Sequence, residues 1–342
     1  MSSFGQKNNI NIRPHSKTHK CSKLAKLQMD YGAIGICVAK VSEAEILINN
    51  SIDNILITSP VVTLNKLNIL ASCLSKQPNT MIVVDNYKNL EDLDALGAKL
   101  ELGIRVLIDL DPGIGRTGIN NTDAINFAKY ISKYKWLSFE GIQCYAGNLQ
   151  HIQSYSERKE QSLSIMKSAS GVANQLKSNG FNCKILTGTG TGTFDIDCND
   201  TLVTEIQPGS YTVMDVEYNK IESNNNKNFT ICSNSMTLLT TVISNNNHNH
   251  ATVDAGTKAI YIDQNKPDII SHEGLHYDWN GFGDEHGKIT ADNNVNLPSY
   301  SDVLELIGPH CDPTINLYDY FYIVEDGIVI DVWEIDMRGK SQ

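Results

Sequence analysis

Met81-Ile-Val-Val-Asp85 and Arg105-Val-Leu-Ile-Asp-Leu-Asp111 are two short, almost continuous apolar runs, and each ends in a carboxylate. Runs of this kind are typical of strands in a parallel sheet that is covered on both faces. Before the first of these runs, apolar residues fall at helical spacing, as Leu64, Leu67 and Leu74 do. The stretch therefore predicts buried parallel strands that alternate with amphipathic helices.

The same pattern extends outward in both directions along the first two thirds of the chain. Further strands are expected at 10–17, 34–39, 54–58, 139–145, 183–187 and 203–207. A strand recurs roughly every 25–30 residues, which is the period of a strand–helix unit. Eight such strands predict an α/β fold, a (β/α)8 TIM-type barrel. An open doubly wound sheet remains the alternative.

The character of the sequence changes near residue 220, where Asn-rich stretches begin to separate β-type runs. Asp326-Gly327 stands between two apolar runs, which is a strong signal for a type I′ hairpin. We therefore expect residues 1–220 to form the barrel and residues 221–342 to form a mostly β C-terminal domain. Its strands are expected at 236–243, 251–254, 259–262, 303–307, 315–324 and 328–335.

Composition limits the class of protein. The 342 residues are 41% hydrophobic and 20% charged, which suits a globular protein with a substantial core. The net charge of −11 argues against nucleic acid or an anionic membrane as partner. No apolar run reaches the roughly 18 residues that a membrane span needs, and the start has no apolar signal core. The 8 cysteines include no CxxC pair, so we expect a cytoplasmic protein with reduced thiols.

A cluster of basic residues, Arg13-Pro-His-Ser-Lys-Thr-His-Lys20, ends the first expected strand. In an extended strand Arg13, His15 and Lys17 share one face, at the carboxyl end where barrel active sites lie. Cationic neighbours would lower the pKa of Lys17 and make it an amine nucleophile toward an aldehyde. A solvated basic turn is the alternative.

Two glycine-rich segments follow later strands. Thr187-Gly-Thr-Gly-Thr-Gly-Thr193 is interpreted as a phosphate cradle, with a flexible linker as the alternative. Gly113-Ile-Gly-Arg-Thr-Gly118 has the spacing of a dinucleotide motif. It follows the fifth expected strand, however, and no acidic residue stands about 20 residues further on. We therefore interpret it as a loop that presents Arg116 to a pocket.

The segment Gly308-Pro-His-Cys-Asp-Pro-Thr314 follows an expected strand. If it is extended, His310 and Asp312 share a face and Cys311 points away. An imidazole and a carboxylate suit a divalent ion such as Mn²⁺, Mg²⁺, Co²⁺ or Zn²⁺. A structural turn with a buried cysteine is the alternative.

Six motifs occur in the order in which a known family carries them. They are Arg13–Lys20, Asp111–Gly118, Gly141–Gly147 with Gln150-His151, Gly190–Gly192, Glu205–Tyr211 and His310–Asp319. On these motifs the chain resembles the fold-type III pyridoxal-phosphate enzymes of the D-threonine aldolase and D-serine dehydratase group. That group has an alanine-racemase-like barrel followed by a β domain.

The resemblance implies roles for particular residues. Lys17, His151 and Arg116 would be catalytic, with His286 as a second choice of base. Gln207 would face the pyridine nitrogen of the cofactor. The implied cofactor-binding residues are Lys17, Gln143, Tyr145, Thr189, Gly190, Thr191, Gly192, Gln207, Gly209, Ser210 and Tyr211, and the implied metal ligands are His310 and Asp312.

The resemblance also implies an activity: cleavage of a D-3-hydroxy amino acid, such as D-threonine, to glycine and an aldehyde. The cofactors would be pyridoxal 5'-phosphate and a divalent metal, Mn or Mg rather than Zn, and the protein would be a homodimer. The alternatives are dehydration of the same substrates, a non-catalytic pyridoxal-phosphate carrier and, more distantly, an NAD-dependent oxidoreductase. The family has a strand and a helix before the lysine segment, and we expect both to be missing here, because only 16 residues precede Lys17.

Overall fold

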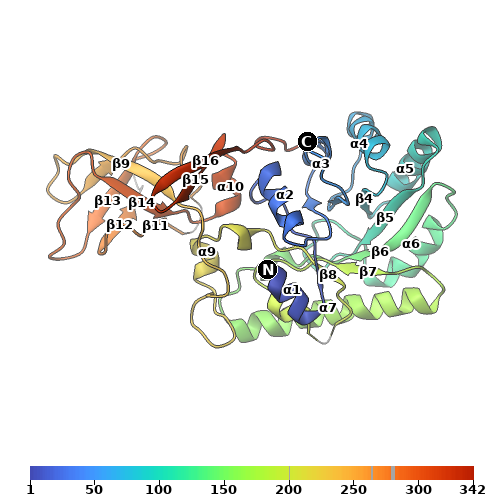
Figure 1. Ribbon diagram of the computed structural model, residues 1–342. Coiled ribbons are helices and arrows are strands. Elements are labelled where there is room, and N and C mark those ends of the chain that lie inside the picture. The colour runs from blue at the N-terminus through green and yellow to red at the C-terminus, as the bar shows by residue number, and fades with distance from the viewer. Residues whose placement is uncertain (200, 263–264, 279–281) are drawn as a thin grey trace. The chain divides into compact units, whose positions relative to one another are not determined.

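The computed structural model describes residues 1–199, 201–262, 265–278 and 282–342 (Figure 1). Two compact units make up this part of the chain. One is Met1–Gly209 together with Tyr320–Gln342, and the other is Ser210–Asp319. The division thus follows Gly209, whereas the sequence suggested one after residue 220. No helix in the described part of the chain is both long and apolar enough to cross a membrane.

The first unit is built on parallel strands. Six of them pair in sequence order: β2 (Cys37–Val38), β3 (Leu56–Ile57), β4 (Met81–Val84), β5 (Ile104–Asp109), β6 (Leu137–Gln143) and β7 (Ile185–Thr187). The other two, β1 (Asn11–Ile12) and β8 (Glu205–Ile206), pair with each other. All eight strands expected from the apolar runs are therefore present, although most are shorter than the runs.

Backbone hydrogen bonds join the two groups of strands into a ring. On one side the Ser16 N–H donates to the Cys37 carbonyl (2.9 Å), which links the end of β1 to β2. On the other side the Thr204 N–H donates to the Leu186 carbonyl (2.9 Å), which links β8 to β7. These bonds close the eight strands into the predicted barrel and exclude the open sheet.

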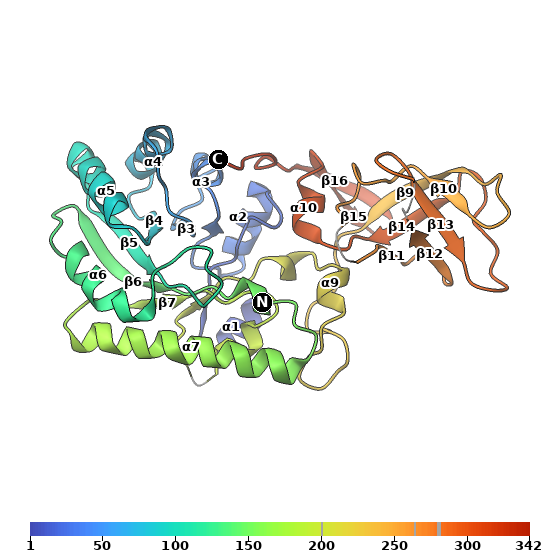
Figure 2. The ribbon, with the colours of Figure 1, turned by 180° about the vertical axis from the view of Figure 1, so that it is seen from behind.

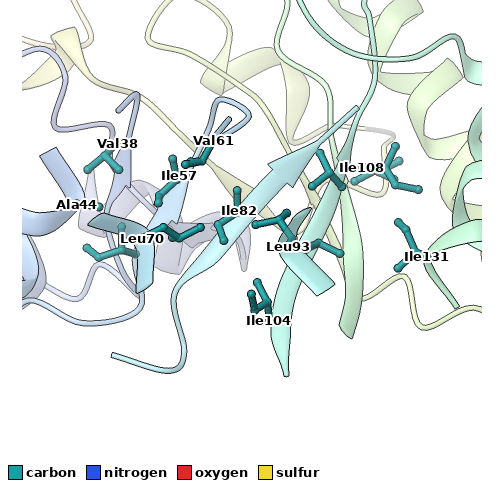
Figure 3. Close-up of a cluster of buried hydrophobic side chains, with 14 of the residues drawn as sticks. Val38, Ala44, Ile57, Val61, Leu70, Ile82, Leu93, Ile104, Ile108 and Ile131 are labelled. Carbon is teal, nitrogen blue, oxygen red and sulfur yellow. The ribbon is translucent and has the colours of Figure 1, made fainter. Parts of the chain in front are cut away.

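Helices surround the strands because their apolar stripes face the sheet. They are α1 (Ser2–Asn8), α2 (Ser22–Asp30), α3 (Val41–Asn49), α4 (Leu64–Lys76), α5 (Tyr87–Leu100), α6 (Ala124–Ile131), α7 (Tyr155–Ser178) and α8 (Phe194–Asp197). Figure 3 shows Ile82 and Ile108 of the strands among Leu70 and Ile131 of the helices. Helix α7 runs on the opposite side of the strands from α3 and α4 (Figures 1 and 2).

The second unit contains an antiparallel sheet. Its strands are β9 (Leu238–Ser244), β10 (Ala251–Val253), β11 (Asp268–Ile269), β12 (Leu275–Asp278), β13 (Gly287–Ala291) and β14 (Val303–Ile307), in the order β11-β14-β9-β10-β13-β12. Two short helices, α9 (Val216–Asn219) and α10 (Cys311–Ile315), belong to the same unit. The strand expected at 259–262 is wrong: the N–H groups of Ala259 and Ile260 both donate to the Gly256 carbonyl and form a turn.

The predicted C-terminal hairpin is confirmed, with strands β15 (Tyr320–Glu325) and β16 (Ile328–Glu334). Its turn residues Asp326 and Gly327 both have positive φ, 49° and 77°, as a type I′ turn requires. The hairpin and the segment that follows it belong to the barrel unit. There the Met337 N–H donates to the Lys20 carbonyl (2.9 Å), so the C-terminal segment is fixed beside the Lys17 region.

Candidate active site

Buried polar side chains gather where the barrel strands end. Asp109 ends β5, Gln143 ends β6, Thr187 ends β7, and Gln207 follows β8; each is at most 4% exposed. The carboxyl ends of parallel strands meet at one edge of a barrel, which is where barrel enzymes place their chemistry. This buried polar set at the carboxyl edge of the barrel marks the candidate site.

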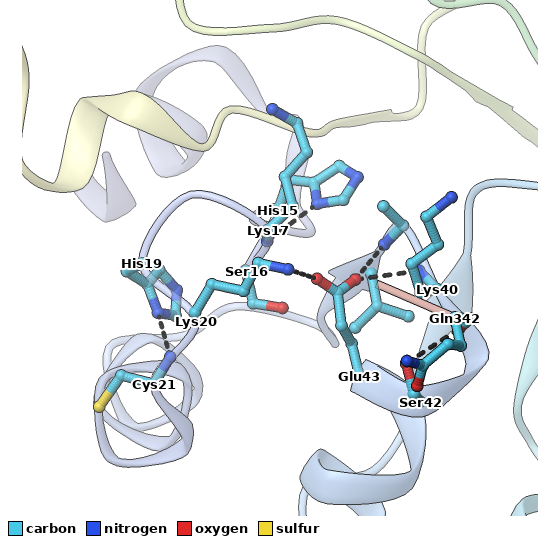
Figure 4. Close-up of polar contacts among 12 residues, drawn as sticks. His15, Ser16, Lys17, His19, Lys20, Cys21, Lys40, Ser42, Glu43 and Gln342 are labelled. Carbon is cyan, nitrogen blue, oxygen red and sulfur yellow. Dashed lines mark hydrogen bonds and ion pairs between the residues drawn. The ribbon is translucent and has the colours of Figure 1, made fainter. Parts of the chain in front are cut away.

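Lys17 lies in a turn just after β1, and His15 holds the backbone of that turn. The Lys17 N–H donates to His15 Nδ1 (3.3 Å), so this ring nitrogen carries no proton. His15 Nε2 lies 3.1 Å from Thr58 Oγ1, and that hydroxyl already donates to the Val38 carbonyl. His15 Nε2 must therefore be the donor, and the imidazole is neutral. In Figure 4 the Lys17 side chain extends away from the Glu43–Lys20 ion pair.

The expected single face of Arg13, His15 and Lys17 does not extend to Lys17. Strand β1 ends at Ile12, and residues 16–19 form a turn, so strand alternation does not reach Lys17. Arg13 instead makes a buried bidentate ion pair with Glu205, at 2.8 and 3.1 Å. The charge of Arg13 is therefore paired within the barrel unit.

A chain of hydrogen bonds crosses the site from β5 to β8. Gln143 Nε2 donates to Asp109 Oδ1 (2.9 Å), and Gln207 Nε2 donates to Gln143 Oε1 (3.3 Å). Thr117 Oγ1 donates to the other Asp109 oxygen (2.7 Å). Burial raises the pKa of Asp109 to about 6, although the hydrogen bonds from Gln143 and Thr117 oppose the shift. The structure thus brings together two of the predicted cofactor residues, Gln143 and Gln207.

The loop that carries Arg116 is held by a carboxylate. Asp111 Oδ1 accepts the backbone N–H groups of residues 113, 114 and 115 at 2.9–3.0 Å, which lowers the pKa of Asp111. Gly113, Gly115 and Gly118 all have positive φ, which this tight loop requires. Arg116 is exposed, and its guanidinium lies 5.5 Å from the centre of the Tyr145 ring. The glycines therefore shape a loop that presents Arg116.

The Gly/Thr run after β7 is held by side chains to which the sequence analysis gave no role. Gln150 Oε1 accepts the Gly192 N–H (2.9 Å), and the fully buried Arg158 donates to the Gly192 carbonyl (2.8 Å). Thr189 Oγ1 donates to the buried Asp197 (2.9 Å). The Gly192 N–H and the Thr189 hydroxyl proton are therefore used within the protein and are not available to the predicted cradle.

Two features of the Lys17 turn fit pyridoxal phosphate. Thr18 Oγ1 is buried, and no residue in the described part of the chain hydrogen bonds to it. Gly209 approaches so closely that a Cβ there would lie 2.5 Å from this oxygen. A buried hydroxyl is rarely left without a partner, and a polar group of a bound cofactor would supply one. Thr18, beside Lys17, is a further candidate that the sequence analysis did not name.

The second unit contains the predicted metal ligands, but not in the predicted conformation. Helix α10 begins at Cys311, so residues 310–312 are not an extended run and the strand-alternation argument for Asp312 is wrong. His310 Nδ1 lies 3.6 Å from Glu217 Oε2, and the Asp312 carboxylate accepts from Ser210 Oγ (3.3 Å). Within the described residues no three or more His, Cys, Asp or Glu side chains gather to hold a metal ion.

The two candidate bases lie in different units. His151 is exposed and follows the short 3-10 helix η2 (Gly147–Leu149) in the barrel unit. His286 is exposed and precedes β13 in the second unit. Tyr211 is in the 3-10 helix η3 (Ser210–Thr212), which opens the second unit.

Comparison with known proteins identifies the class first. A family model described as the alanine racemase N-terminal domain matches residues 5–216, and one described as a putative serine dehydratase domain matches residues 235–324. The chain is 34% identical over 343 residues to the D-threonine aldolase of Arthrobacter sp, covering 100% of this chain and 89% of the relative. It is 31% identical over 345 residues to the 3-hydroxy-D-aspartate aldolase of Paracoccus denitrificans (strain Pd 1222), covering 100% and 88%.

Solved structures agree with this class. The crystal structure of D-threonine aldolase from Filomicrobium marinum superposes with a TM-score of 0.92 at 32% identity, covering 100% of this chain and 91% of that one. The chain belongs to the D-threonine aldolase family of fold-type III pyridoxal-phosphate lyases. The predicted fold and family resemblance are thereby confirmed.

Proposed function

We propose that this chain cleaves D-3-hydroxy amino acids between Cα and Cβ, and converts D-threonine to glycine and acetaldehyde. The observation that carries the proposal is the buried polar edge of the barrel beside Lys17, in a chain whose relatives are named D-threonine aldolase and 3-hydroxy-D-aspartate aldolase. In this reaction the Cα–Cβ bond breaks, the 3-hydroxyl loses its proton as the aldehyde forms, and Cα gains a proton.

Pyridoxal phosphate, when bound, accepts the electron pair that bond cleavage leaves on Cα. In the proposal Lys17 Nζ attaches the cofactor, and Gly209, Ser210 and Tyr211 contribute to its binding. The Thr18 hydroxyl and the backbone of Gly190 and Thr191 hold the phosphate. The exposed guanidinium of Arg116, placed over Tyr145, attracts the substrate carboxylate. His151, which is exposed at the same unit, removes the hydroxyl proton.

The proposal includes a divalent ion at His310 and Asp312, with Mn²⁺ or Mg²⁺ preferred to Zn²⁺. An imidazole beside carboxylates supports it, since Glu217 lies near His310. Two or three protein donors hold an ion weakly, so water or substrate oxygens must complete the coordination. We also propose that the protein is cytoplasmic and that it forms a homodimer, as fold-type III relatives commonly do. Sedimentation of the purified protein tests the dimer.

Dehydration is a second candidate function. It is favoured by the match of residues 235–324 to a putative serine dehydratase domain. In that reaction the 3-hydroxyl leaves as water, and hydrolysis of the resulting enamine gives 2-oxobutanoate and ammonia from D-threonine. The two reactions are told apart by their products.

The test begins with an absorbance spectrum of the purified protein after incubation with pyridoxal phosphate. A visible band, followed by release of acetaldehyde and glycine from D-threonine and loss of activity on chelation, is the expected result. Acetaldehyde is measured by enzymatic reduction. Absence of the band overturns the proposal, and ammonia with 2-oxobutanoate as the main products moves the chain to the dehydratase function.

A further inference from the structure

Asp109, Gln143 and Gln207 form a hydrogen-bonded series at the carboxyl edge of the barrel. Their exposed fractions are 3%, 3% and 4%, so bulk water does not supply partners for their polar atoms. A side-chain amide has a donor end and an acceptor end, and its neighbours decide which way it is turned. The orientation of each amide can therefore be deduced, starting from a neighbouring group that can only accept a hydrogen bond.

The fixed neighbour is a backbone carbonyl. Gln143 lies 3.2 Å from the Thr58 carbonyl oxygen, which can only accept, so the Gln143 group at this position must be Nε2. The same Nε2 donates its second proton to Asp109 Oδ1 at 2.9 Å. Both donors of the Gln143 amide are thus used on this side, and its Oε1 must face the other way.

The side-chain amide of Gln207 contacts Gln143 Oε1 at 3.3 Å. The Gln207 atom at this contact must be Nε2, because two amide oxygens do not attract each other. Gln207 Nε2 also donates to Thr187 Oγ1 at 2.9 Å, which uses its second proton. Turning the Gln207 amide over would place its oxygen against Gln143 Oε1. The acceptor Oε1 is therefore the end of Gln207 that remains for a ligand.

We infer that Asp109 and Gln143 are positioning residues that fix Gln207 with its oxygen, not its nitrogen, offered to the bound cofactor. The inference rests on the proposed function and on the place opposite the pyridine nitrogen that the family resemblance implies for Gln207. An acceptor at that place selects a ring nitrogen that carries a proton. Asp109 strengthens the selection, because its negative charge polarises both amides in the same direction. The amide remains a weaker partner than a carboxylate would be.

The direct measurement is ¹⁵N NMR of the protein loaded with pyridoxal phosphate labelled at the ring nitrogen. At pH 7 the wild-type signal should have the shift of a protonated pyridine. Gln143→Met keeps the volume but frees the Gln207 amide to turn over. In this variant the pH at which the ring loses its proton should fall by about one unit, since a hydrogen bond to a charged group is worth about 1.5 kcal/mol.

Two further variants complete the test. Thr80→Val is the control, because it removes a buried hydroxyl that has no hydrogen-bond partner among the described residues and lies just before β4, away from Gln143, so the ¹⁵N transition should not move. Asp109→Asn retains the shape and the acceptor, and should lower the transition by less than Gln143→Met does. Asp109→Asn therefore tests the hydrogen-bonded series even if Gln143→Met does not fold.

An unprotonated ring in the wild type at pH 7, or a transition that neither Gln143→Met nor Asp109→Asn moves, overturns the inference while leaving the proposed function intact. Failure of the wild-type protein to bind pyridoxal phosphate at all overturns both.

Discussion

Single hydrogen bonds decide the chemistry of the Lys17 turn. His15 is neutral because its Nδ1 accepts the Lys17 N–H, and Lys20 is paired with Glu43 at 2.5 Å. Residues 13–20 contain two lysines, two histidines and an arginine, and the sequence cannot show which of them are paired. The partners of Arg13, His15 and Lys20 lie 23 to 192 residues away along the chain. Lys17 itself could be predicted, since motif and strand order place it at the carboxyl edge.

Lys17→Ala should abolish the visible band of the bound cofactor and its covalent trapping by borohydride. The reason is that the amine that attaches the aldehyde is lost, while circular dichroism should remain unchanged. Lys20→Ala is the matched control from the same segment: it breaks the ion pair with Glu43 but should keep the band. Peptide mapping of the trapped protein checks the assignment, and a label on Lys20 or Lys258 would refute it.

At the scale of secondary-structure elements, the conformation of the loop after β7 depends on contacts with helices that the sequence does not place beside it. The Gly/Thr run was recognised from its glycines and its flanking apolar residues. Gln150, Arg158 and Asp197, which hold it, carry no local signal, because a buried arginine on an amphipathic helix looks like a surface residue in sequence. The same limit explains the His310 segment, where a strand was extended through residues that begin helix α10.

Gly190→Val should weaken cofactor binding by about tenfold or more. A Cβ at this position would lie 2.4 Å from Gln150 Oε1 and 2.7 Å from its Cδ, so Gln150 must move and release the Gly192 N–H. Overpacking of this kind costs roughly 1–3 kcal/mol. Gly171→Ala in helix α7 is the control, because nothing lies within 4 Å of its added Cβ. A titration of the protein with pyridoxal phosphate measures both, and equal affinities would contradict the cradle.

Asp197→Asn should change how stability depends on pH. Burial raises the pKa of Asp197 to about 6, despite hydrogen bonds from Ser162 and Thr189. The ionised carboxylate therefore costs free energy above about pH 6, and this cost disappears as pH falls toward 4, where the unfolded chain also becomes protonated. Between pH 4 and 7 the variant should gain about 2–3 kcal/mol of unfolding free energy relative to the wild type.

Urea unfolding at several pH values measures this difference. Asp111→Asn is a comparison for which the change in unfolding free energy should have the opposite sign. Backbone N–H groups lower the pKa of Asp111, so its charge stabilises the folded state above its folded pKa. A wild-type minus Asp197→Asn difference that does not vary with pH would show that Asp197 is not held at a raised pKa.

On the scale of the whole molecule, the prediction of the fold depended mostly on the number of expected strands and on the order of the motifs. Eight buried apolar runs and one turn dipeptide were enough for the barrel and the C-terminal hairpin, because these signals are local. The return of Tyr320–Gln342 to the barrel unit was not predictable. It depends on the bond between Met337 and Lys20 and on Asp336 accepting the Ser22 N–H, contacts between the two ends of the chain.

The identity of the metal ion and the reaction product are properties of the whole enzyme. If the ion binds at His310 and Asp312, carboxylate and imidazole donors should favour a hard ion, and activity lost on chelation should return with Mn²⁺ better than with Zn²⁺. Asp312→Ala should then remove most activity. Cys311 is fully buried in helix α10 and its Sγ lies 3.4 Å from Asp312 Oδ1, so Cys311→Ser, which keeps a donor there, should change the rate little. Acetaldehyde release from D-threonine measures the recovery with Mn²⁺ and with Zn²⁺ and the activities of Asp312→Ala and Cys311→Ser. Strict dependence on Cys311, or recovery with Zn²⁺ alone, would contradict the hard site and favour a thiolate-bound ion.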